Sequence, residues 1–501
     1  MAKPFGMITK YYPFIDEESR TILDTLIEES ENYYEFTQRL GEVVLNNDVS
    51  INLAYLAAVH TWWCRAEDTM SQIQEKYRYL PCIRPWGYPH ANMILLLKLH
   101  DPLVEAIEEA RKTTIEDWME TELHLLHSYF HYPYHGDVPS LLKPVESAKR
   151  LIDANPNLKC FEPLIYALEG YAMGNEGDTE EAITKFKKGL ELAGSYDDAL
   201  YKYIILVNYG AASYGLHIQS ALQLYEELYQ LAQDLGVPYL LSEVLNDSGI
   251  VYEIAGEYDL AISCHREVIG LIGENFWTST ILSRIYAFLG QEQRALDEIN
   301  QYIERTGTPE FPSWGLARAR SLALLNRVEE AERDLESIQA QLMRIGSEAH
   351  LTIFDHVSGM IEMARGNYST ATDILEKCMD ASEVISHSER NYILLNLAKS
   401  ELILAQEHPN TSGMATPGKW LSKLERYAWD RDLPGIKMQA ALLKSEFYQQ
   451  NGQLKDALVT LMDSLSITDS PGVATLRKRI NSRIQEIDGL IKDGRPDSPI
   501  V

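Results

Sequence analysis

Cysteines are few in this sequence, and they lie far apart. The 501 residues include five of them, and no two form a CxxC pair. Zinc knuckles and disulfide frameworks require cysteines at close and repeated spacing. The sequence therefore excludes both, and its cysteine pattern fits a reducing compartment.

Long apolar runs are also lacking. No stretch approaches the about 20 apolar residues that a membrane-spanning helix needs, and residues Met1 to Lys10 are not followed by the apolar core of a signal peptide. We therefore expect no membrane span and predict a cytoplasmic protein.

Positive charge is in short supply. Lys and Arg number 45 against 74 Asp and Glu, which gives a formal net charge of -29. A surface of this sign repels phosphate backbones and anionic membranes, so nucleic acid is not expected as a partner. The apolar fraction of 45% and the aromatic fraction of 10% are sufficient for a continuous core.

Catalytic signatures are absent as well. There is no GxSxG elbow, HExxH pair or Rossmann glycine fingerprint. The segment Gly413 to Trp420 has the glycine and lysine spacing of a phosphate loop, but Trp420 stands where such a loop has the Ser or Thr that holds magnesium. We expect no enzyme activity and no cofactor.

What the sequence does contain is a repeat. Its clearest unit runs from Leu241 to Ile272, with Gly249 in a first amphipathic run, Gly256 at a turn and Ala261 in a second run. Two antiparallel helices approach closely only where small side chains face each other, and glycine permits the tight turn between them. The unit is therefore a predicted helical hairpin.

The same frame recurs along most of the chain. The alanine of the second run recurs at intervals of 34 to 40 residues from Ala182 to Ala371, and the longer gap before Ala457 leaves room for one more unit, from Asn391 to Arg431. The alanines of the frame are Ala182, Ala221, Ala261, Ala295, Ala331, Ala371 and Ala457. Several units in one frame indicate a repeat protein.

This pattern resembles the tetratricopeptide repeat family, and the longer period resembles the repeats in sensor arms of large prokaryotic regulators. The resemblance implies an all-α fold, a right-handed superhelical solenoid of antiparallel helix pairs. A plain helical bundle with alanines in register is the alternative.

The predicted organisation has four parts. Residues 1–157 are read as divergent helical hairpins, with a long helix from Asn52 to Tyr77 among them, although a separate N-terminal helical domain fits nearly as well. Residues 158–472 hold the repeats. Residues 473–492 form a capping helix, because apolar residues from Val473 to Ile491 step by three and four. Residues 493–501 form a disordered tail.

The family resemblance also implies a concave groove, lined by the first helices of successive units. Carried onto this sequence, the groove is a mixed polar and aromatic surface. Its predicted lining is Asn246, Glu253, Trp277, Arg284, Phe288, Arg320 and His356. Such a surface suits an extended peptide or a partner helix. The alternative is that Trp277 and Phe288 are core residues in a shifted frame.

A histidine cluster is the strongest candidate for metal chemistry. His124, His127, His131 and His135 are spaced three, four and four residues apart, which would place them on one helical face. Pro133 disfavours a helix that continues to His135. We therefore predict that His131 and His135 lie in a loop and that no metal is bound.

Taken together, the patterns favour a non-enzymatic scaffold or adaptor that binds a peptide or partner protein in the groove. The first alternative is a regulatory or sensor subunit that binds a small molecule or signal peptide. The second is a metal-dependent enzyme that uses the histidine region. A homo-oligomer is compatible with each of them.

Overall fold

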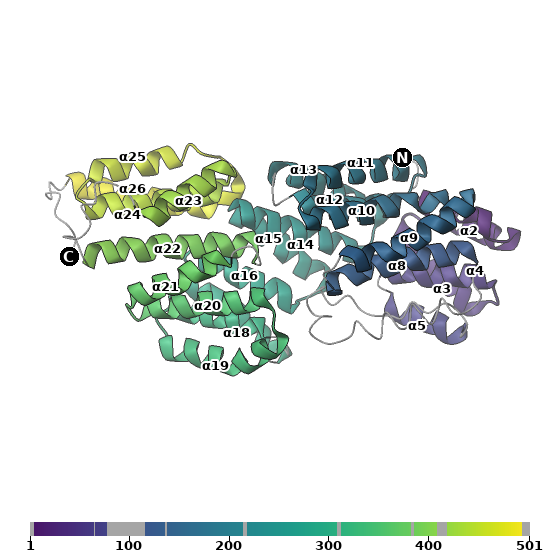
Figure 1. The fold of residues 1–501 in the computed structure, drawn as a ribbon, viewed down its shortest axis with the longest axis horizontal. Helices are drawn as coiled ribbons and strands as arrows, with labels where there is room; N and C mark the ends of the chain where they lie inside the picture. Colours follow the sequence, from purple (N-terminus) through teal and green to yellow (C-terminus); the bar gives the residue numbers. More distant parts are fainter. Residues whose placement is uncertain are drawn as a thin grey trace. The chain divides into compact units, whose positions relative to one another are not determined.

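The structure is a computed structural model of the chain, and it describes residues 5–64, 66–77, 116–135, 138–213, 218–307, 312–381, 385–407 and 418–492. Within these ranges all regular structure is helical, and no strand is present (Figure 1). The all-α prediction is therefore confirmed for the described part of the chain.

The chain divides into two compact units, Met1–Val244 and Leu245–Val501. The division falls within one continuous helix, α14 (Pro238–Ala255). The boundaries predicted at residues 157 and 472 mark where the repeats begin and end. The division into compact units does not test them, so they stay predictions. The tail from residue 493 onward lies outside the described residues.

The first unit is made of short and long helices that pack mainly on their neighbours along the chain. In order they are α1 (Gly6–Thr9), η1 (Tyr12–Phe14), α2 (Glu17–Glu29), α3 (Tyr33–Asn46), α4 (Ile51–Trp63), α5 (Glu67–Lys76), α8 (Asp117–His135), α9 (Val138–Ala154), η2 (Pro156–Phe161), α10 (Glu162–Glu176), α11 (Thr179–Ser195), α12 (Ala199–Ser213), α13 (Ile218–Leu235) and the start of α14.

The second unit contains the rest of α14 and the helices that follow it. These are α15 (Tyr258–Ile272), α16 (Phe276–Phe288), α17 (Glu292–Thr306), α18 (Ser313–Leu324), α19 (Val328–Ile345), α20 (Glu348–Ala364), α21 (Tyr368–Asp380), α22 (His387–Glu407), α23 (Lys419–Asp430), α24 (Pro434–Gln450), α25 (Leu454–Ser464), η3 (Pro471–Val473) and α26 (Ala474–Lys492).

The single helix predicted from Asn52 to Tyr77 is wrong. Ala66 takes a non-helical conformation, with ψ 65°, and separates α4 from α5. This turn lets α5 fold back against α3 and α4, where Met70 and Ile73 become fully buried. The gain from burying these two side chains outweighs the helical hydrogen bonds lost at the break.

The helices form antiparallel pairs with a common turn. In most pairs, the residue five positions before the frame alanine has a positive φ, as Gly177 does before Ala182 and Gly256 before Ala261. The same place holds Asn326, with φ 56°, before Ala331. A left-handed residue reverses the chain without a loop, and Asn tolerates this conformation better than most non-glycine residues.

Within a pair, the close contact joins a glycine to a large side chain. A Cβ atom on Gly249 of α14 would lie 2.7 Å from the His265 ring of α15, and one on Gly170 of α10 would lie 2.9 Å from the Phe186 ring of α11. His265 and Phe186 each follow the frame alanine by four residues, one helical turn. The glycine thus makes room for a large side chain, whereas the sequence frame predicted two small residues face to face.

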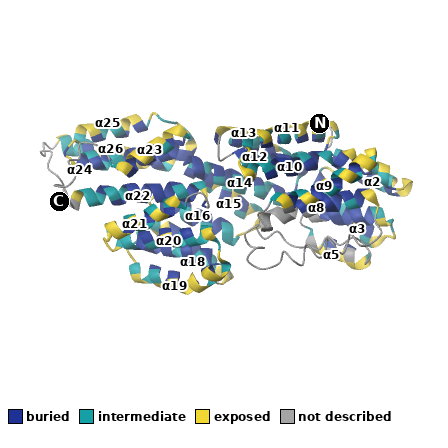
Figure 2. Cartoon of the chain, in the orientation of Figure 1, coloured by how far each residue is buried: buried dark blue, intermediate teal, exposed yellow. Residues whose placement is uncertain are grey.

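First helices are buried on more sides than second helices. Nearly every residue of α18 from Ser313 to Ala323 is buried, whereas α19 buries one stripe that includes Ala331 and Ile338 (Figure 2). This difference follows from the sequence, because apolar and small residues occur on all sides of α18, with Arg318 and Arg320 as the exceptions, whereas α19 is amphipathic. The described helices thus form a tetratricopeptide-like, all-α solenoid of helix pairs.

The second unit closes on itself. The turn between α14 and α15 lies so close to the start of α24 that a Cβ atom on Gly435 would overlap the Gly256 carbonyl. The Thr475 amide at the start of α26 donates to the Asp259 carboxylate of α15 at 2.9 Å. The C-terminal helices of this unit therefore pack on its first repeat.

None of the helices that the structure describes combines the length and the apolar character required to cross a membrane.

Candidate functional site

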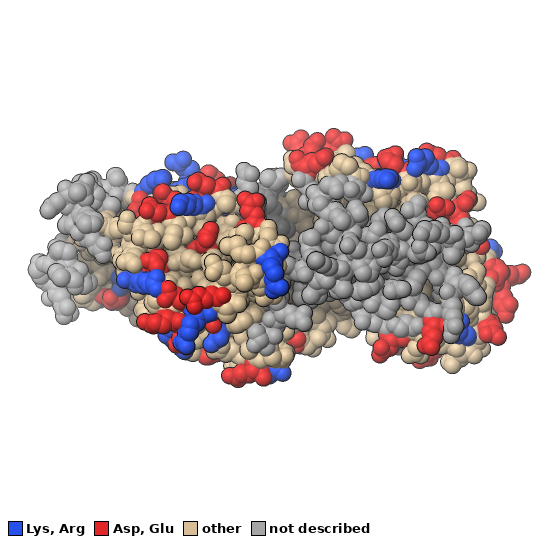
Figure 3. All heavy atoms as spheres, turned by 60° about the horizontal axis from the view of Figure 1, so that its bottom comes forward, with Lys and Arg blue, Asp and Glu red and all other residues tan. Residues whose placement is uncertain are grey.

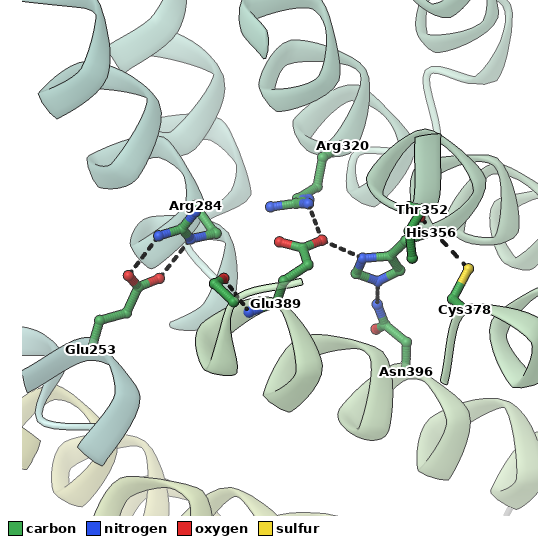
Figure 4. A network of polar contacts seen from close by, with 9 residues as sticks. Glu253, Arg284, Arg320, Thr352, His356, Cys378, Glu389 and Asn396 are labelled. Carbon is green, nitrogen blue, oxygen red and sulfur yellow. Dashed lines mark hydrogen bonds and ion pairs between the residues drawn. The ribbon is translucent and has the colours of Figure 1, made fainter. Parts of the chain in front are cut away.

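Three of the seven predicted groove residues, which come from successive first helices, contact α22. Arg320 of α18 and His356 of α20 both contact Glu389 of α22, and Phe288 of α16 lies 4.0 Å from the Tyr392 ring of α22, centroid to centroid. Arg320, His356 and Glu389 belong to the polar network drawn in Figure 4. In this conformation α22 lies against part of the predicted groove lining, at Phe288, Arg320 and His356.

Glu253 and Arg284 form the first part of this network. Arg284 Nε and Nη2 donate to the two Glu253 carboxylate oxygens, both at 2.6 Å. The Glu253 side chain is 1% exposed and that of Arg284 19%. A two-point contact fixes the orientation of the guanidinium, so Arg284 joins α14 to α16.

Glu389 forms the second part and connects three helices. Its carboxylate accepts from Arg320 Nη2 at 2.5 Å and from His356 Nδ1 at 2.5 Å. Burial raises the pKa of Glu389, but Arg320 and His356 outweigh burial and hold the pKa at about 2. The carboxylate is therefore ionised at neutral pH and fastens α22 to α18 and α20.

His356 is neutral in this arrangement. Its Nδ1 faces the Glu389 carboxylate and its Nε2 lies 3.0 Å from the Asn396 amide nitrogen. One nitrogen donates and the other accepts, as in neutral imidazole. Burial lowers the pKa of His356, in spite of the opposing effect of Glu389. The His356 ring thus connects two residues of α22 by hydrogen bonds, Asn396 on one side and Glu389 on the other.

Two further predicted groove residues, Trp277 and Asn246, belong to α16 and α14. Trp277 and Asn246 are half-buried, neither fully core nor fully exposed. Partner binding by the seven predicted residues therefore stays a prediction. Sequence reasoning missed Glu389, Tyr392 and Asn396, although α22 offers a signal: apolar residues occur on all of its sides, which is typical of a helix surrounded by others.

A cavity opens beside the network. It measures about 270 Å³ and lies among α18, α20, α22 and α24. Its wall is partly apolar, with Met360, Met363 and Leu402, and partly polar, with Asn396. Asn396 thus belongs both to the cavity wall and to the chain of hydrogen bonds that ends on Glu389.

Two oppositely charged side chains line the same cavity. Lys399 of α22 and Glu446 of α24 are half-buried, and neither makes a hydrogen bond or ion pair with a described residue. Burial lowers the pKa of Lys399, and Arg479 lowers it further. Burial also raises the pKa of Glu446. Each group also shifts the pKa of the other toward the charged form, so the two opposite charges attract each other across the cavity wall.

The histidine cluster lies on a longer helix than predicted. α8 runs to His135, so the expected loop after Pro133 is wrong. A proline this close to the end of a helix removes one hydrogen bond only, which the last turn tolerates. His124 is buried with Nε2 3.5 Å from Glu120, whereas the side chains of His127, His131 and His135 lie outside the described residues.

Across the described part of the chain, no group of three His, Cys, Asp or Glu residues is arranged to hold a metal ion. The phosphate-loop-like segment is described only from Gly418 onward. There Lys419 forms an ion pair with Glu376 at 3.2 Å, and the Trp420 amide donates to Glu401 at 2.7 Å.

Charges of both signs are interspersed on the surface. On the face drawn in Figure 3, the described Lys and Arg side chains lie beside Asp and Glu and form no continuous basic patch. This distribution accords with the excess of acidic residues. The described residues on this face therefore form no continuous basic surface to which a phosphate backbone could bind.

No protein-family model and no curated protein matches the chain. Among solved structures, a tetratricopeptide repeat protein from Parabacteroides merdae is 12% identical, with 61% of this chain and 98% of that chain covered and a TM-score of 0.32. A signal-transduction ATPase with a tetratricopeptide repeat sensor from Pyrococcus horikoshii is 14% identical, with 92% and 55% covered and a TM-score of 0.31.

A human IFIT1 dimer determined with m7Gppp-AAAA is 12% identical, with 84% of this chain and 92% of that chain covered and a TM-score of 0.41. At these identities and TM-scores the three proteins carry no argument about what this chain binds. The tetratricopeptide-like fold of the chain rests on its own helix pairs, their glycine contacts and their left-handed turns.

Proposed function

We propose that this chain is a non-enzymatic scaffold that binds a partner protein, and that one side chain of the partner is anchored in the cavity of unit 2. The observation that carries this proposal is the pair Lys399 and Glu446. Both line the cavity, and neither has a hydrogen-bonding partner among the described residues.

Partial burial of these two charges costs solvation free energy in the unbound protein, and their attraction for each other offsets only part of that cost. A ligand that offers an acidic group to Lys399 and a donor group to Glu446 recovers that energy. The apolar wall at Met360 and Leu402 supplies contact area for the aliphatic part of the same ligand. The cavity thus favours an amphipathic, charged ligand.

The size of the cavity supports a protein partner. Ligand pockets usually occupy about 300 to 1,000 Å³, and about 270 Å³ accommodates one or two side chains. Interfaces often depend on a few such anchors in fully desolvated pockets. The rest of a partner would lie outside the cavity, on the surface of the repeats.

The proposal is tested with peptides selected from a displayed random library against the full chain. Their affinities for wild type, Lys399→Met and Glu446→Gln are then measured by calorimetry. A hydrogen bond to a charged group contributes about 1.5 to 3 kcal/mol, so we expect each variant to weaken binding by tenfold or more.

Lys455→Met is the matched control, because Lys455 is an exposed lysine of α25 in the same unit. It should leave affinity within twofold of wild type. If the selected peptides bind Lys399→Met and Glu446→Gln with the same affinity as Lys455→Met, the cavity does not anchor the partner.

A second candidate function is that of a sensor, and Asn396 favours it. This residue lines the cavity and also donates toward His356, which contacts Glu389. A small ligand in the cavity would compete for the Asn396 amide and so loosen the attachment of α22. Adding single free amino acids and dicarboxylic acids to the full chain tests this function, with a rise in melting temperature lost in Lys399→Met as the expected result.

A further inference from the structure

Several side chains from residues 5–15 lie in the interior of unit 1. Phe5, Met7, Ile8, Lys10 and Tyr11 are all buried, although they precede the first long helix. Their contacts come from elements far along the sequence: the Phe5 ring packs on α3, and Tyr11 packs on α4, α8 and η2. The segment of residues 5–15, called here the N-terminal segment, therefore lies where several helices of the unit converge.

The N-terminal segment is attached as a bound peptide would be. Its backbone hydrogen bonds join residues of the segment to one another, such as Lys10 N to the Gly6 carbonyl. From outside it, the described residues supply one bond to its backbone, from Asn52 Nδ2 to the Phe14 carbonyl at 3.0 Å. The helix that follows has its own cap, because Asp16 accepts from the Ser19 amide at 2.7 Å. The start of α2 thus does not depend on the segment.

Lys10 is the polar anchor of the segment. Its ammonium lies 2.6 Å from Asp198 Oδ2, and the two side chains are 2% and 0% exposed. The same ammonium lies 3.4 Å from the centroid of the Tyr201 ring and 5.8 Å from that of Phe161. An acid and aromatic faces around one cation form a site for an ammonium ion, because each ring face is electron-rich.

The acid of this site is held in place without Lys10. Asp198 caps α12, since its Oδ1 accepts from the Tyr201 amide at 2.9 Å, and its other oxygen is left for the ammonium. A buried ion pair seldom stabilises a protein more than well-packed apolar residues would. The pair therefore selects a cation at this position more than it stabilises the fold.

Further polar groups surround the segment. Tyr11 donates to Glu122 Oε1 at 2.5 Å. The Tyr201 hydroxyl and His60 Nε2 are buried without a hydrogen-bonding partner in the described structure. The interior of unit 1 is thus polar and aromatic around the segment. A segment that fills it must supply matching hydrogen-bonding groups, which an ordinary apolar core does not require.

We infer that the interior of unit 1 is a binding site for a peptide segment that carries a primary ammonium next to an aromatic residue. Residues 5–15 occupy the site in cis, and a partner segment of the same chemistry competes with them. This site is separate from the cavity proposed for unit 2, so either inference stands or falls without the other.

Gly6 offers a way to displace the segment while leaving its site intact. A Cβ atom on Gly6 would lie 2.4 Å from the carbonyl oxygen of Asp197 and 2.5 Å from that of Tyr196. Both are backbone atoms, which cannot rotate away as a side chain can. Gly6→Ala in the full chain should therefore expel the segment, and Thr9→Ala is the matched control because Thr9 is exposed.

The probe is a fluorescent synthetic peptide with the sequence of residues 5–15, titrated into each full-chain variant. We expect Gly6→Ala to bind it at least tenfold more tightly than wild type and Thr9→Ala do. Adding Asp198→Asn should remove that gain, because Asn keeps the helix cap but loses the charge. A peptide with norleucine in place of Lys10 should bind at least tenfold more weakly.

Two results would overturn the inference. One is a Gly6→Ala chain that binds the peptide no more tightly than wild type does. The same holds if its affinity for the peptide is unchanged by Asp198→Asn and by norleucine in place of the peptide lysine. The other is loss of helical circular dichroism in both Gly6→Ala and Lys10→Met, which would make the segment an obligatory part of the core. A folded Lys10→Met chain that gains affinity for the peptide would support the inference independently.

Discussion

Glu389→Gln tests whether the polar network holds α22 in the second unit. Glu389 accepts hydrogen bonds from both Arg320 and His356. The substitution keeps the shape of the side chain and removes its charge. Arg320, whose side chain is 5% exposed, would then be buried without a counter-ion.

The expected loss can be worked out in two ways. The pKa of Glu389 falls from 4.5 to about 2 on folding, and at about 1.4 kcal/mol per unit this contributes about 3 kcal/mol of stability at pH 7. Breaking a buried ion pair by removing one partner costs about 3 to 5 kcal/mol. The two routes together give an expected loss of about 3 to 5 kcal/mol.

Urea unfolding followed by circular dichroism measures this loss. The matched control is Glu425→Gln, which breaks the half-exposed pair of Glu425 with Lys444 and should cost less than about 1 kcal/mol. Adding Arg320→Met to Glu389→Gln should recover most of the stability, since no unpaired charge remains. A Glu389→Gln chain within 1 kcal/mol of wild type would refute this account of how α22 is held.

Three further predictions concern packing, acid and the groove. Gly249→Ala should destabilise the chain by about 1 to 3 kcal/mol, because the new methyl group meets the His265 ring, whereas Gly270→Ala, whose Cβ meets open space, should stabilise it by about 0.5 to 1 kcal/mol; equal melting temperatures would contradict the packing. Burial holds the pKa of His60 and His265 at about 3, so the unfolded state takes up protons first below about pH 6.5. Because His60 lies in unit 1 and His265 in unit 2, we expect each unit to lose about 3 kcal/mol of stability by pH 4.5, and unchanged helical circular dichroism at that pH would be inconsistent with neutral buried imidazoles. Trp277→Ala should weaken binding of a selected peptide by about 1 to 4 kcal/mol without loss of helix if the half-buried Trp277 is a groove anchor; a folded variant with unchanged affinity would leave it a core residue.

The repeat frame could be found from sequence because the small residues that it requires lie close together in the chain. Gly256 and Ala261 are required by the turn and the contact within one hairpin, and both lie within a few positions of each other. Asn326 takes the same left-handed turn without glycine, so the sequence frame did not mark it. The start of α3 also has a local signal, because Asn32 caps it by accepting from the Glu35 amide, and Asn followed three residues later by Glu is a helix-start signal.

The candidate site could be predicted only in part. The first-helix positions at Arg320 and His356 converge as the family resemblance implies, but the residue that joins them, Glu389, comes from a helix more than 30 residues later. Periodicity describes each helix and its neighbour, and it contains no information about which later helix enters the concave side. Likewise, nothing local in residues 5–15 indicates that Lys10 pairs with Asp198, 188 residues away.

The contact between Gly256 and Gly435 changes how the second unit should respond to denaturant. In an open array each repeat touches only its neighbours, so the ends fray and unfolding can spread one repeat at a time. Here the first turn of the unit is pinned against α24 and Asp259 caps α26, so neither end can unravel without breaking contacts at the other. Unit 2 should therefore melt as a single cooperative block, and it should fold slowly for a helical protein, because closing it brings together residues nearly 180 positions apart.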